Sequence, residues 1–203
     1  MRTELTPDDL PGRAFYRLLT SVVVPRPIAW ISTTSASGVD NLAPHSFFTI
    51  ASTAPAIVQF SSSGHKDTLR NVEETGEFVV NLAPQELQRQ VNESAVDFPP
   101  DISEFDAVGI KREASRAVRP PRVAASPVAL ECRLHSTVAL GGTTVVFGEV
   151  VHAAVADSAM VDGHPDVALL HPLSRLGRNE WATVGEVSRV DRISYTDWPD
   201  GAR

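Results

Sequence analysis

Three short apolar runs constrain the fold of this chain most, because each one ends in a cluster of hydroxyl, amide or glycine residues. The runs with their polar ends are Pro27–Thr34, Asp40–Phe48 and Ala56–Thr68. Apolar runs of this length, bounded by Gly, Pro, Ser and Asn, are typical of β-strands. We therefore expect a β-protein whose strand ends gather neutral hydrogen-bond donors and one cation, Lys66, in one place.

Length and composition exclude several classes of protein. The 203 residues, 42% of them hydrophobic, predict a single domain (1–203) with an ordinary core. The formal net charge of −7 argues against binding to nucleic acid. No apolar run approaches the ~20 residues of a membrane span, and the N-terminus lacks the apolar segment of a signal peptide. The single cysteine, Cys132, excludes an internal disulfide framework, which fits a reducing, cytoplasmic compartment. Cys132 alternates in phase with Leu130 and Leu134, so it is expected in the core.

The remaining chain predicts more strands, joined mostly by short turns, and a few short helices. Further strands are expected at Val22–Val24, Glu77–Leu82, Val128–His135 and Val145–His152. Helices are expected from Thr6, from Asp67 or Thr68 to Gly76, over Pro84–Asn92 and over Pro165–Leu170. Residues 94–127 form an irregular arm with two proline pairs, and residues 188–203 form a tail without a specific pattern. Six or seven strands with few helices predict a mainly β fold, a small closed barrel with helical insertions.

The octapeptide Ser61–Thr68 is the sharpest local feature. It lies between a predicted strand and a predicted helix, where free N–H groups and the helix dipole favour a phosphate. Lys66 adds a positive charge, and Gly64 lets the backbone come close to a ligand. The alternative is an ordinary strand-to-helix loop with a helix cap, which is much commoner than a phosphate site.

The stretch Asn41–Phe48 is a second candidate, because Pro44 bends the predicted strand and exposes neighbouring N–H and C=O groups. Such a bent backbone could pair with the polar edge of an isoalloxazine ring. The alternative is a strand with a proline bulge, and on this octapeptide alone that alternative is preferred. Taken together, the two features suit an anionic, polyhydroxyl ligand with a flat ring, such as flavin mononucleotide (FMN).

Several motifs in a fixed order resemble the flavin reductase-like family of FMN-binding split-barrel proteins. They are Arg26–Thr33, Asn41–Phe48, Gly64–Asn71, Gly76–Asn81, Asp97–Pro100, Ser126–Cys132, Gly148–Val151 and Arg175–Gly177. The resemblance extends from about Ser21 to Val187. It implies a Greek-key-like split barrel of six to seven strands and a homodimer that holds FMN, or less often FAD, at its interface.

The resemblance also assigns residues to the flavin. Ser61, Ser62, Lys66 and Thr68 match the phosphate and ribityl contacts of the family, with Ser32 and Thr33 on the preceding strand. Asn41, Ala43, Ser46 and Phe47 match the stretch beside the ring edge, and Arg175 lies in a C-terminal motif that approaches the flavin.

Catalysis by such a protein requires stacking and orientation more than acid–base groups, because the flavin carries the reaction. His45, His152 and His171 are the polar candidates near such a face, and His45 is the favoured one. Glycine-rich nicotinamide fingerprints are absent, which leaves NADH and NADPH open. The scattered histidines predict no metal site. The basic run from Lys111 to Arg122 is interpreted as a solvated loop or a dimer-spanning arm.

The preferred function is an NAD(P)H-dependent flavin reductase that supplies reduced flavin to a partner oxygenase. One alternative is an enzyme with resident FMN that acts on a small organic substrate. Another is a non-catalytic flavin carrier. The irregular arm at 94–127 is expected to influence substrate choice if it folds over the flavin.

Overall fold

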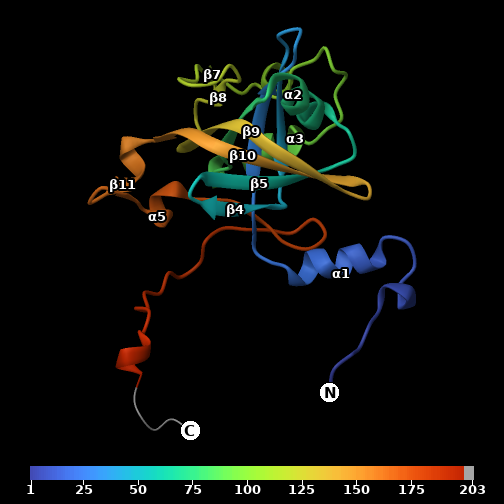
Figure 1. Cartoon of the computed structure of the whole chain (residues 1–203), viewed down its shortest axis with the longest axis vertical. Helices are drawn as coiled ribbons and strands as arrows, with labels where there is room; N and C mark the ends of the chain where they lie inside the picture. Colours follow the sequence, from blue (N-terminus) through green and yellow to red (C-terminus); the bar gives the residue numbers. More distant parts are fainter. Residues whose placement is uncertain (199–203) are drawn as a thin grey trace.

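A seven-stranded antiparallel sheet forms the body of the protein in this computed structural model, which describes residues 1–198 (Figure 1). Its strand order is β3-β2-β6-β9-β10-β5-β4. The strands are β2 (Ala29–Thr34), β3 (Asp40–His45), β4 (Phe48–Thr53), β5 (Ala56–Ser63), β6 (Glu77–Leu82), β9 (Val128–Leu140) and β10 (Thr143–Val155). The prediction of a mainly β fold with six or seven strands is confirmed. The last residues of the predicted tail, 199–203, lie outside the described part of the chain.

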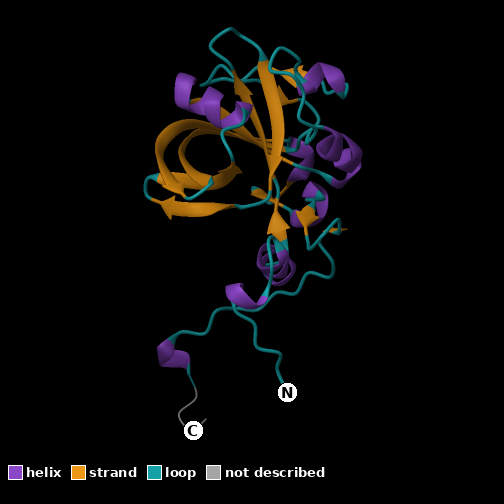
Figure 2. Cartoon of the chain, turned by 90° about the vertical axis from the view of Figure 1, so that its right-hand side faces the viewer, coloured by secondary structure: helices purple, strands orange, loops and turns teal. Residues whose placement is uncertain are grey.

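The two edge strands of this sheet are joined in a way that closes the barrel. β3 and β4 lie at opposite ends of the strand order, yet only Ser46 and Phe47 separate them in sequence. The Ser61 N–H donates to the Phe47 carbonyl at 2.9 Å, so β5 pairs with the chain just beyond β3. The long hairpin of β9 and β10 curls round the other side, as Figure 2 shows. We call the Ser46–Phe47 step the seam.

Two apolar clusters hold the barrel, and β2 contributes to both. Ala29 and Ile31 belong to one cluster with Phe60 and Phe78, while Trp30 belongs to a second that packs against the helices and the arm. Alternate residues of a strand point to opposite faces, so all of β2 is buried.

Gly148 of β10 lies against the first cluster. A Cβ atom at this position would lie 2.1 Å from Phe78 Cζ. The aromatic ring therefore requires glycine here.

The helices differ from the predictions at their ends. The helical segments are η1 (Pro7–Asp9), α1 (Ala14–Val22), α2 (Asp67–Thr75), η2 (Gln85–Leu87), α3 (Gln88–Glu93), α4 (Glu104–Ala107), η3 (Asp157–Ala159), α5 (Val167–Leu170) and η4 (Tyr195–Asp197). The strand expected at Val22–Val24 is wrong, because α1 continues to Val22 and Arg26 bonds the carbonyls at its end. The helix expected from Thr6 is only a single turn before a break at Gly12. Lys66, rather than Asp67 or Thr68, is the N-cap of α2.

Short paired strands complete the fold. They are β1 (Arg26–Pro27), β7 (Arg112–Glu113), β8 (Arg122–Val123), β11 (Met160–Val161), β12 (His164–Pro165), β13 (Ser174–Arg175) and β14 (Trp181–Ala182). β7 and β8 lie in the segment predicted to be an irregular arm, as does α4. The arm is therefore ordered in part.

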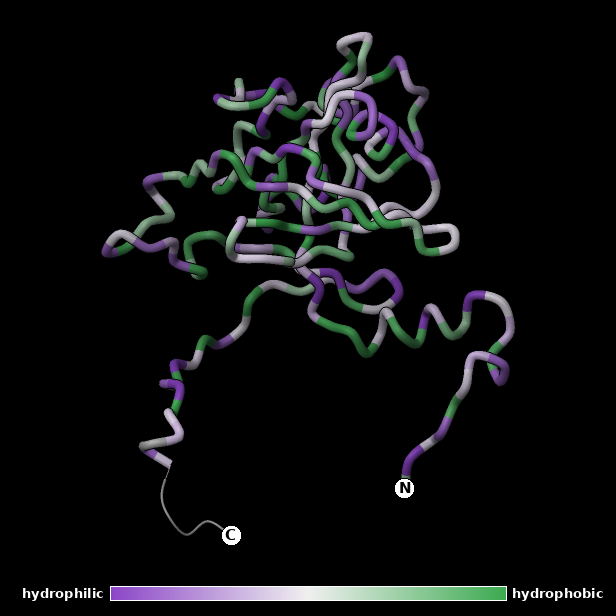
Figure 3. Tube along the Cα trace, in the orientation of Figure 1, coloured by the Kyte–Doolittle hydropathy of each residue, from purple (hydrophilic) through white to green (hydrophobic). Residues whose placement is uncertain are grey.

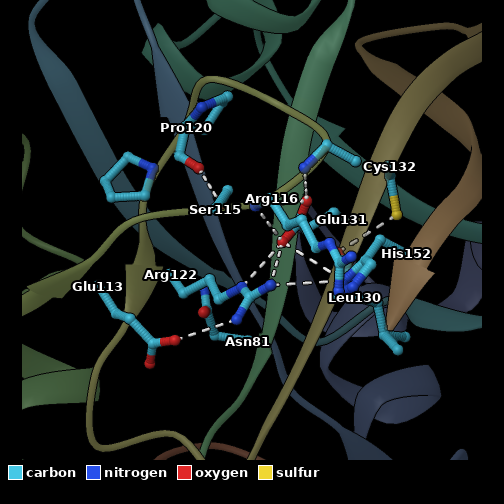
Figure 4. A network of polar contacts seen from close by, with 12 residues as sticks. Asn81, Glu113, Ser115, Arg116, Pro120, Arg122, Leu130, Glu131, Cys132 and His152 are labelled. Carbon is cyan, nitrogen blue, oxygen red and sulfur yellow. Dashed lines mark hydrogen bonds and ion pairs between the residues drawn. The ribbon is translucent and has the colours of Figure 1, made fainter. Parts of the chain in front are cut away.

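A buried carboxylate fastens the second half of the arm to the sheet (Figure 4). Glu131 of β9 has no exposed surface and accepts hydrogen bonds from the backbone N–H groups of Arg116 and Ala117, at 2.9 and 2.5 Å. The Arg122 guanidinium donates to the same carboxylate at 2.8 Å. Burial alone raises the pKa of Glu131, but these donors outweigh it and hold that pKa below its ordinary value.

Both ends of the chain extend away from the barrel on the same side (Figures 1 and 2). Hydrophobic segments recur on α1 and the extensions, outside the barrel (Figure 3). Among the described residues, no helix is long and apolar enough to cross a membrane.

Candidate functional site

A cavity of about 550 Å³ lies at the seam, where β3 passes into β4 and β5 leads into α2. It is lined by residues of α1, of both sides of the seam, of the start of α2 and of the first half of the arm. These residues are Tyr16, Asn41, Ala43, Pro44, His45, Ser46, Phe47, Ser61, Ser62, Ser63, Lys66, Asp67, Thr68, Arg70, Ser94, Ala95, Val96, Asp97, Phe98, Pro100 and Glu104. The fold therefore brings four separate parts of the sequence to one place.

Most of the predicted site residues line this cavity. They are Asn41, Ala43, His45, Ser46, Phe47, Ser61, Ser62, Lys66 and Thr68. The two octapeptides singled out in the sequence meet because β3 and β5 are neighbours across the seam.

The structure places the other predicted residues elsewhere. The hydroxyl of Ser32 is buried and donates to the Pro121 carbonyl at 2.5 Å, and that of Thr33 accepts from the Asn71 amide at 3.0 Å. Both side chains are satisfied inside the sheet and do not reach the cavity. Arg175 lines a neighbouring cavity instead.

The two other candidate histidines are also outside the cavity lining. His152 lies 3.6 Å from the Glu131 carboxylate and belongs to the polar network shown in Figure 4. His171 pairs with Glu86 on the surface at 2.6 Å. Both histidines therefore contact carboxylates of the protein and do not face the cavity.

The start of α2 presents cationic and N–H groups to the cavity. The first helical bond of α2 joins the Arg70 N–H to the Lys66 carbonyl, so the amides of residues 67–69 precede the helical ladder. The side chain of Lys66 is 60% exposed and pairs with Asp97 of the arm at 2.6 Å. An exposed ion pair of this kind contributes little to stability and can exchange its partner for a ligand.

Acidic groups at this end of the cavity are already engaged. Asp67 pairs with Arg70. The Glu104 carboxylate accepts the Leu42 N–H at 2.8 Å. Burial raises the pKa of Glu104, and the nearby Asp67 charge acts in the same direction. Lys66 is therefore the cation best placed to meet an anionic group in this cavity.

In the lining of this cavity, His45 has a buried ring nitrogen without a hydrogen-bond partner among the described residues. Its Nδ1 lies 3.2 Å from the Ser61 carbonyl, which can only accept, so Nδ1 carries the proton. Burial lowers the pKa of His45 to about 4, and the Lys66 charge adds to the effect. The ring is then neutral near pH 7, and its buried Nε2 is an acceptor with no partner among the described residues.

The first half of the arm supplies a wall that sequence reasoning did not assign to individual residues. Val96, Asp97, Phe98 and Pro100 line the cavity. The motif at 97–100 was a signal for this wall, since it belongs to the pattern of the family resemblance. Tyr16 of α1 also lines the cavity, and its ring lies 6.3 Å from that of Phe47. Nothing local in the sequence distinguishes Tyr16 from its neighbours on the helix.

The cavity fits a flavin mononucleotide by the chemistry of its groups. Lys66 and the first amides of α2 would hold the phosphate. The orphaned Nε2 of His45 offers an acceptor to a ligand N–H or O–H group. Phe47 and Phe98 supply apolar surface for a flat ring.

The sequence profile described as "Flavin reductase like domain" matches residues 21–171. The chain belongs to the flavin reductase-like family. A protein of Halalkalibacterium halodurans, itself described as uncharacterized, is 38% identical to it over 200 residues, which covers 93% of this chain and 96% of the other.

Two solved structures of the family superpose closely on this flavin reductase-like chain. Nitrilotriacetate monooxygenase component B from Bacillus cereus is 30% identical, with a TM-score of 0.90 over 94% of this chain and 99% of that one. The 2-nitrobenzoate 2-nitroreductase of Pseudomonas fluorescens is 29% identical, with a TM-score of 0.88 over 95% and 98%. A flavin reductase with a split barrel domain from Shewanella frigidimarina is 22% identical and superposes with a TM-score of 0.86 over 95% of this chain and 100% of that one. The split-barrel fold inferred from the sequence is thereby confirmed.

Proposed function

We propose that this protein binds FMN in the cavity at the seam and reduces it with NADH or NADPH, supplying reduced flavin to a partner oxygenase. The observation that carries the proposal is the orphaned Nε2 acceptor of His45, buried beside Lys66 and the start of α2. The likeness to a monooxygenase component B supports the role of reductase for a partner.

The protein residues would bind and orient, and FMN when bound supplies the hydride chemistry. Lys66 would release Asp97 and neutralise the phosphate. His45 would accept a hydrogen bond without donating a proton, because its lowered pKa keeps it neutral near pH 7. Val96, Phe98 and Pro100 would exclude water from one side of the ring.

Visible absorbance of the purified protein tests this function directly. Flavin absorbance that bleaches when NADH or NADPH is added without oxygen supports the reductase. Absence of flavin binding after incubation with FMN and FAD would overturn the proposal.

The Lys66→Ala variant tests the position of the phosphate. We expect FMN binding to weaken by about 1.5–3 kcal/mol, the usual scale for a hydrogen bond to a charged group. Lys111→Ala is the matched control, since Lys111 is exposed and outside the cavity lining. Equal FMN affinities of the two variants would place the phosphate elsewhere.

A second candidate function is a resident-FMN enzyme that acts directly on a small organic substrate. The arm wall at residues 96–100 favours it, because it narrows the cavity on the side where a substrate would enter. The likeness to a nitroreductase supports it too. FMN that stays bound through purification, with turnover of an added nitroaromatic acid, would support this candidate over the release of reduced flavin.

We also propose that the protein works as a cytoplasmic homodimer. Val22, Val23 and Ile50 expose 63%, 60% and 70% of their surface. Burial of these apolar side chains against a second copy would remove them from water and stabilise the dimer. Sedimentation equilibrium should give twice the 21.9 kDa mass of the chain. A measured mass equal to that of one chain would exclude the dimer.

A further inference from the structure

A second cavity, of about 810 Å³, lies between α1 and the chain at residues 175–178. It adjoins the first cavity, because Tyr16 and Ser46 line both. Five arginines line it and no acidic residue does, although the whole chain has a formal net charge of −7. These arginines are Arg13, Arg17, Arg26, Arg175 and Arg178.

Arg26 is the buried member of this group, with 7% of its surface exposed. Its guanidinium donates to the carbonyl oxygens of Thr20, Val23 and Leu176, and these acceptors carry no negative charge. Its Nε atom is buried without a partner among the described residues. Buried charges in proteins are normally paired, so this arrangement lacks a counter-charge.

The remaining arginines leave this charge uncompensated. In the described part of the chain, none of the five forms an ion pair with a carboxylate. Burial lowers the pKa of Arg26, and the neighbouring Arg175 charge lowers it further. The negative charge of an anion in the cavity would act in the opposite direction and favour the charged form of Arg26.

The walls of this cavity are held in place by close contacts. A Cβ atom at Gly177 would lie 2.5 Å from Ser21 Oγ, so the loop approaches α1 as closely as glycine permits. The Arg26 guanidinium joins the two walls through its 2.7 Å bond to the Leu176 carbonyl. Arg175 is held against the Trp181 ring at 4.8 Å and donates to the Arg178 carbonyl at 2.8 Å. The guanidinium groups of Arg26 and Arg175 are thus held in place before any ligand binds.

We propose that this arginine cavity binds the diphosphate group of a dinucleotide whose other end enters the first cavity past Tyr16 and Ser46. Guanidinium groups match phosphate oxygens in paired hydrogen bonds, and a diphosphate brings more negative charge than a single carboxylate. The inference deepens the proposed function and rests on it. A nicotinamide dinucleotide and FAD both carry this group.

Calorimetric titration with ADP tests the cavity, because ADP has a diphosphate but neither nicotinamide nor flavin. We expect Arg17→Gln and Arg178→Gln each to weaken ADP binding about tenfold, as for one charged hydrogen bond lost. Both side chains are exposed, so the variants should fold normally. Arg133→Gln is the matched control, an exposed arginine of β9 outside either cavity lining.

The source of the diphosphate is distinguished by two further titrations of the same variants. A parallel loss in NADH or NADPH affinity assigns the cavity to the nicotinamide dinucleotide. A loss confined to FAD, with FMN affinity unchanged, assigns it to the adenylate half of FAD.

ADP that fails to bind the wild-type protein, or binds both variants as tightly as the control, overturns the inference. Variants that alter dimer formation without any ADP binding also overturn it, since the cavity is then a contact between subunits. ADP can be titrated into the protein whether or not FMN binds. Failure of the proposed function is therefore read separately, from FMN binding and nicotinamide oxidation.

Discussion

The arm at residues 94–127 has two halves that are attached to the barrel in different ways. The second half is fastened by the buried Glu131 carboxylate, which receives two backbone N–H groups and the Arg122 guanidinium. The first half is held at its base by Ser94 and near its end by the buried Glu104 carboxylate, which accepts the Leu42 N–H. Between these two points, the wall at residues 96–100 is held by the exposed Lys66–Asp97 pair. Buried contacts therefore fix the second half and both ends of the first half, whereas an exposed ion pair holds the part of the arm that lines the cavity.

Loss of the Glu131 charge should give the largest effect. In Glu131→Gln the Arg122 guanidinium, whose side chain is 11% exposed, loses its buried counter-charge. Breaking such a pair costs about 3–5 kcal/mol of unfolding free energy, measured by urea denaturation. Glu113→Gln is the control, because Glu113 contacts the same arginine from an exposed position. If Glu131→Gln and Glu113→Gln lose equal unfolding free energy, the buried carboxylate does not hold the second half of the arm more strongly than an exposed one would.

The stability contributions of His45 in the cavity and of the Glu131 network should be lost over different ranges of pH. The pKa of His45 is about 4 in the folded protein and 6.5 when unperturbed, so the unfolded chain binds the extra proton between these values. Stability should fall by roughly 2–3 kcal/mol as pH drops from 6.5 to 4. A His45→Gln variant should lack this fall. The same slope in both proteins would assign it to another group.

The Glu131 contribution has a different pH window. Its folded pKa lies below the ordinary value of 4.5, so its stabilisation is complete above that value. It is lost only as the pH falls further, through the folded pKa. Comparison of wild type with Glu131→Gln below pH 4.5 should show the two stabilities converging.

Removal of the Ser94 hydroxyl should give an intermediate effect. Ser94 Oγ accepts the hydrogen bond of the buried Trp30 Nε1 at 2.9 Å. Ser94→Ala leaves that donor unsatisfied, which costs about 1–2 kcal/mol of unfolding free energy. Ser136→Ala, at an exposed position of β9, is the control for a serine hydroxyl in general. A loss as large as that of Glu131→Gln would mean that both halves of the arm are equally fixed.

The smallest effect on stability is expected at Asp97. Its carboxylate is 81% exposed and pairs with Lys66, so Asp97→Asn should change the unfolding free energy by less than about 0.5 kcal/mol. The same variant should bind FMN a few-fold more tightly, because Lys66 no longer has to leave a partner. Fluorescence titration with FMN measures this, and weaker binding would show that Asp97 itself contacts the ligand.

Much of the barrel could be predicted because its signals are local. Apolar runs with polar ends located β2, β5 and β6, and Gly76 closes α2 in the left-handed conformation, as its position suggested. The turn at Gly141–Gly142 likewise joins β9 to β10. The strand prediction at Val22–Val24 is wrong because β-branched residues favour strands in general, whereas Arg26 fixes these residues at a helix end.

The site was harder to predict where it depends on side chains that meet only after folding. The hydroxyl groups of Ser32 and Thr33 are of a kind that could bind a phosphate. Inside the sheet, however, they form hydrogen bonds with the Pro121 carbonyl and the Asn71 amide. Arg175 lines the adjoining cavity and not the first one, because α1 packs against its loop at Gly177. These outcomes depend on contacts between segments far apart in sequence, which local patterns do not encode.

The FMN that we propose to bind at the seam would influence how long the protein survives in the cell. A ligand that contacts β3, the seam and β5 at once would hold the two edges of the barrel together where they meet. It should slow exchange of the Ser61 amide proton, whose bond to the Phe47 carbonyl joins the two edges. Chains that never acquire flavin would open there more often, so proteases would remove them first, and the cellular supply of flavin would set the amount of protein that survives.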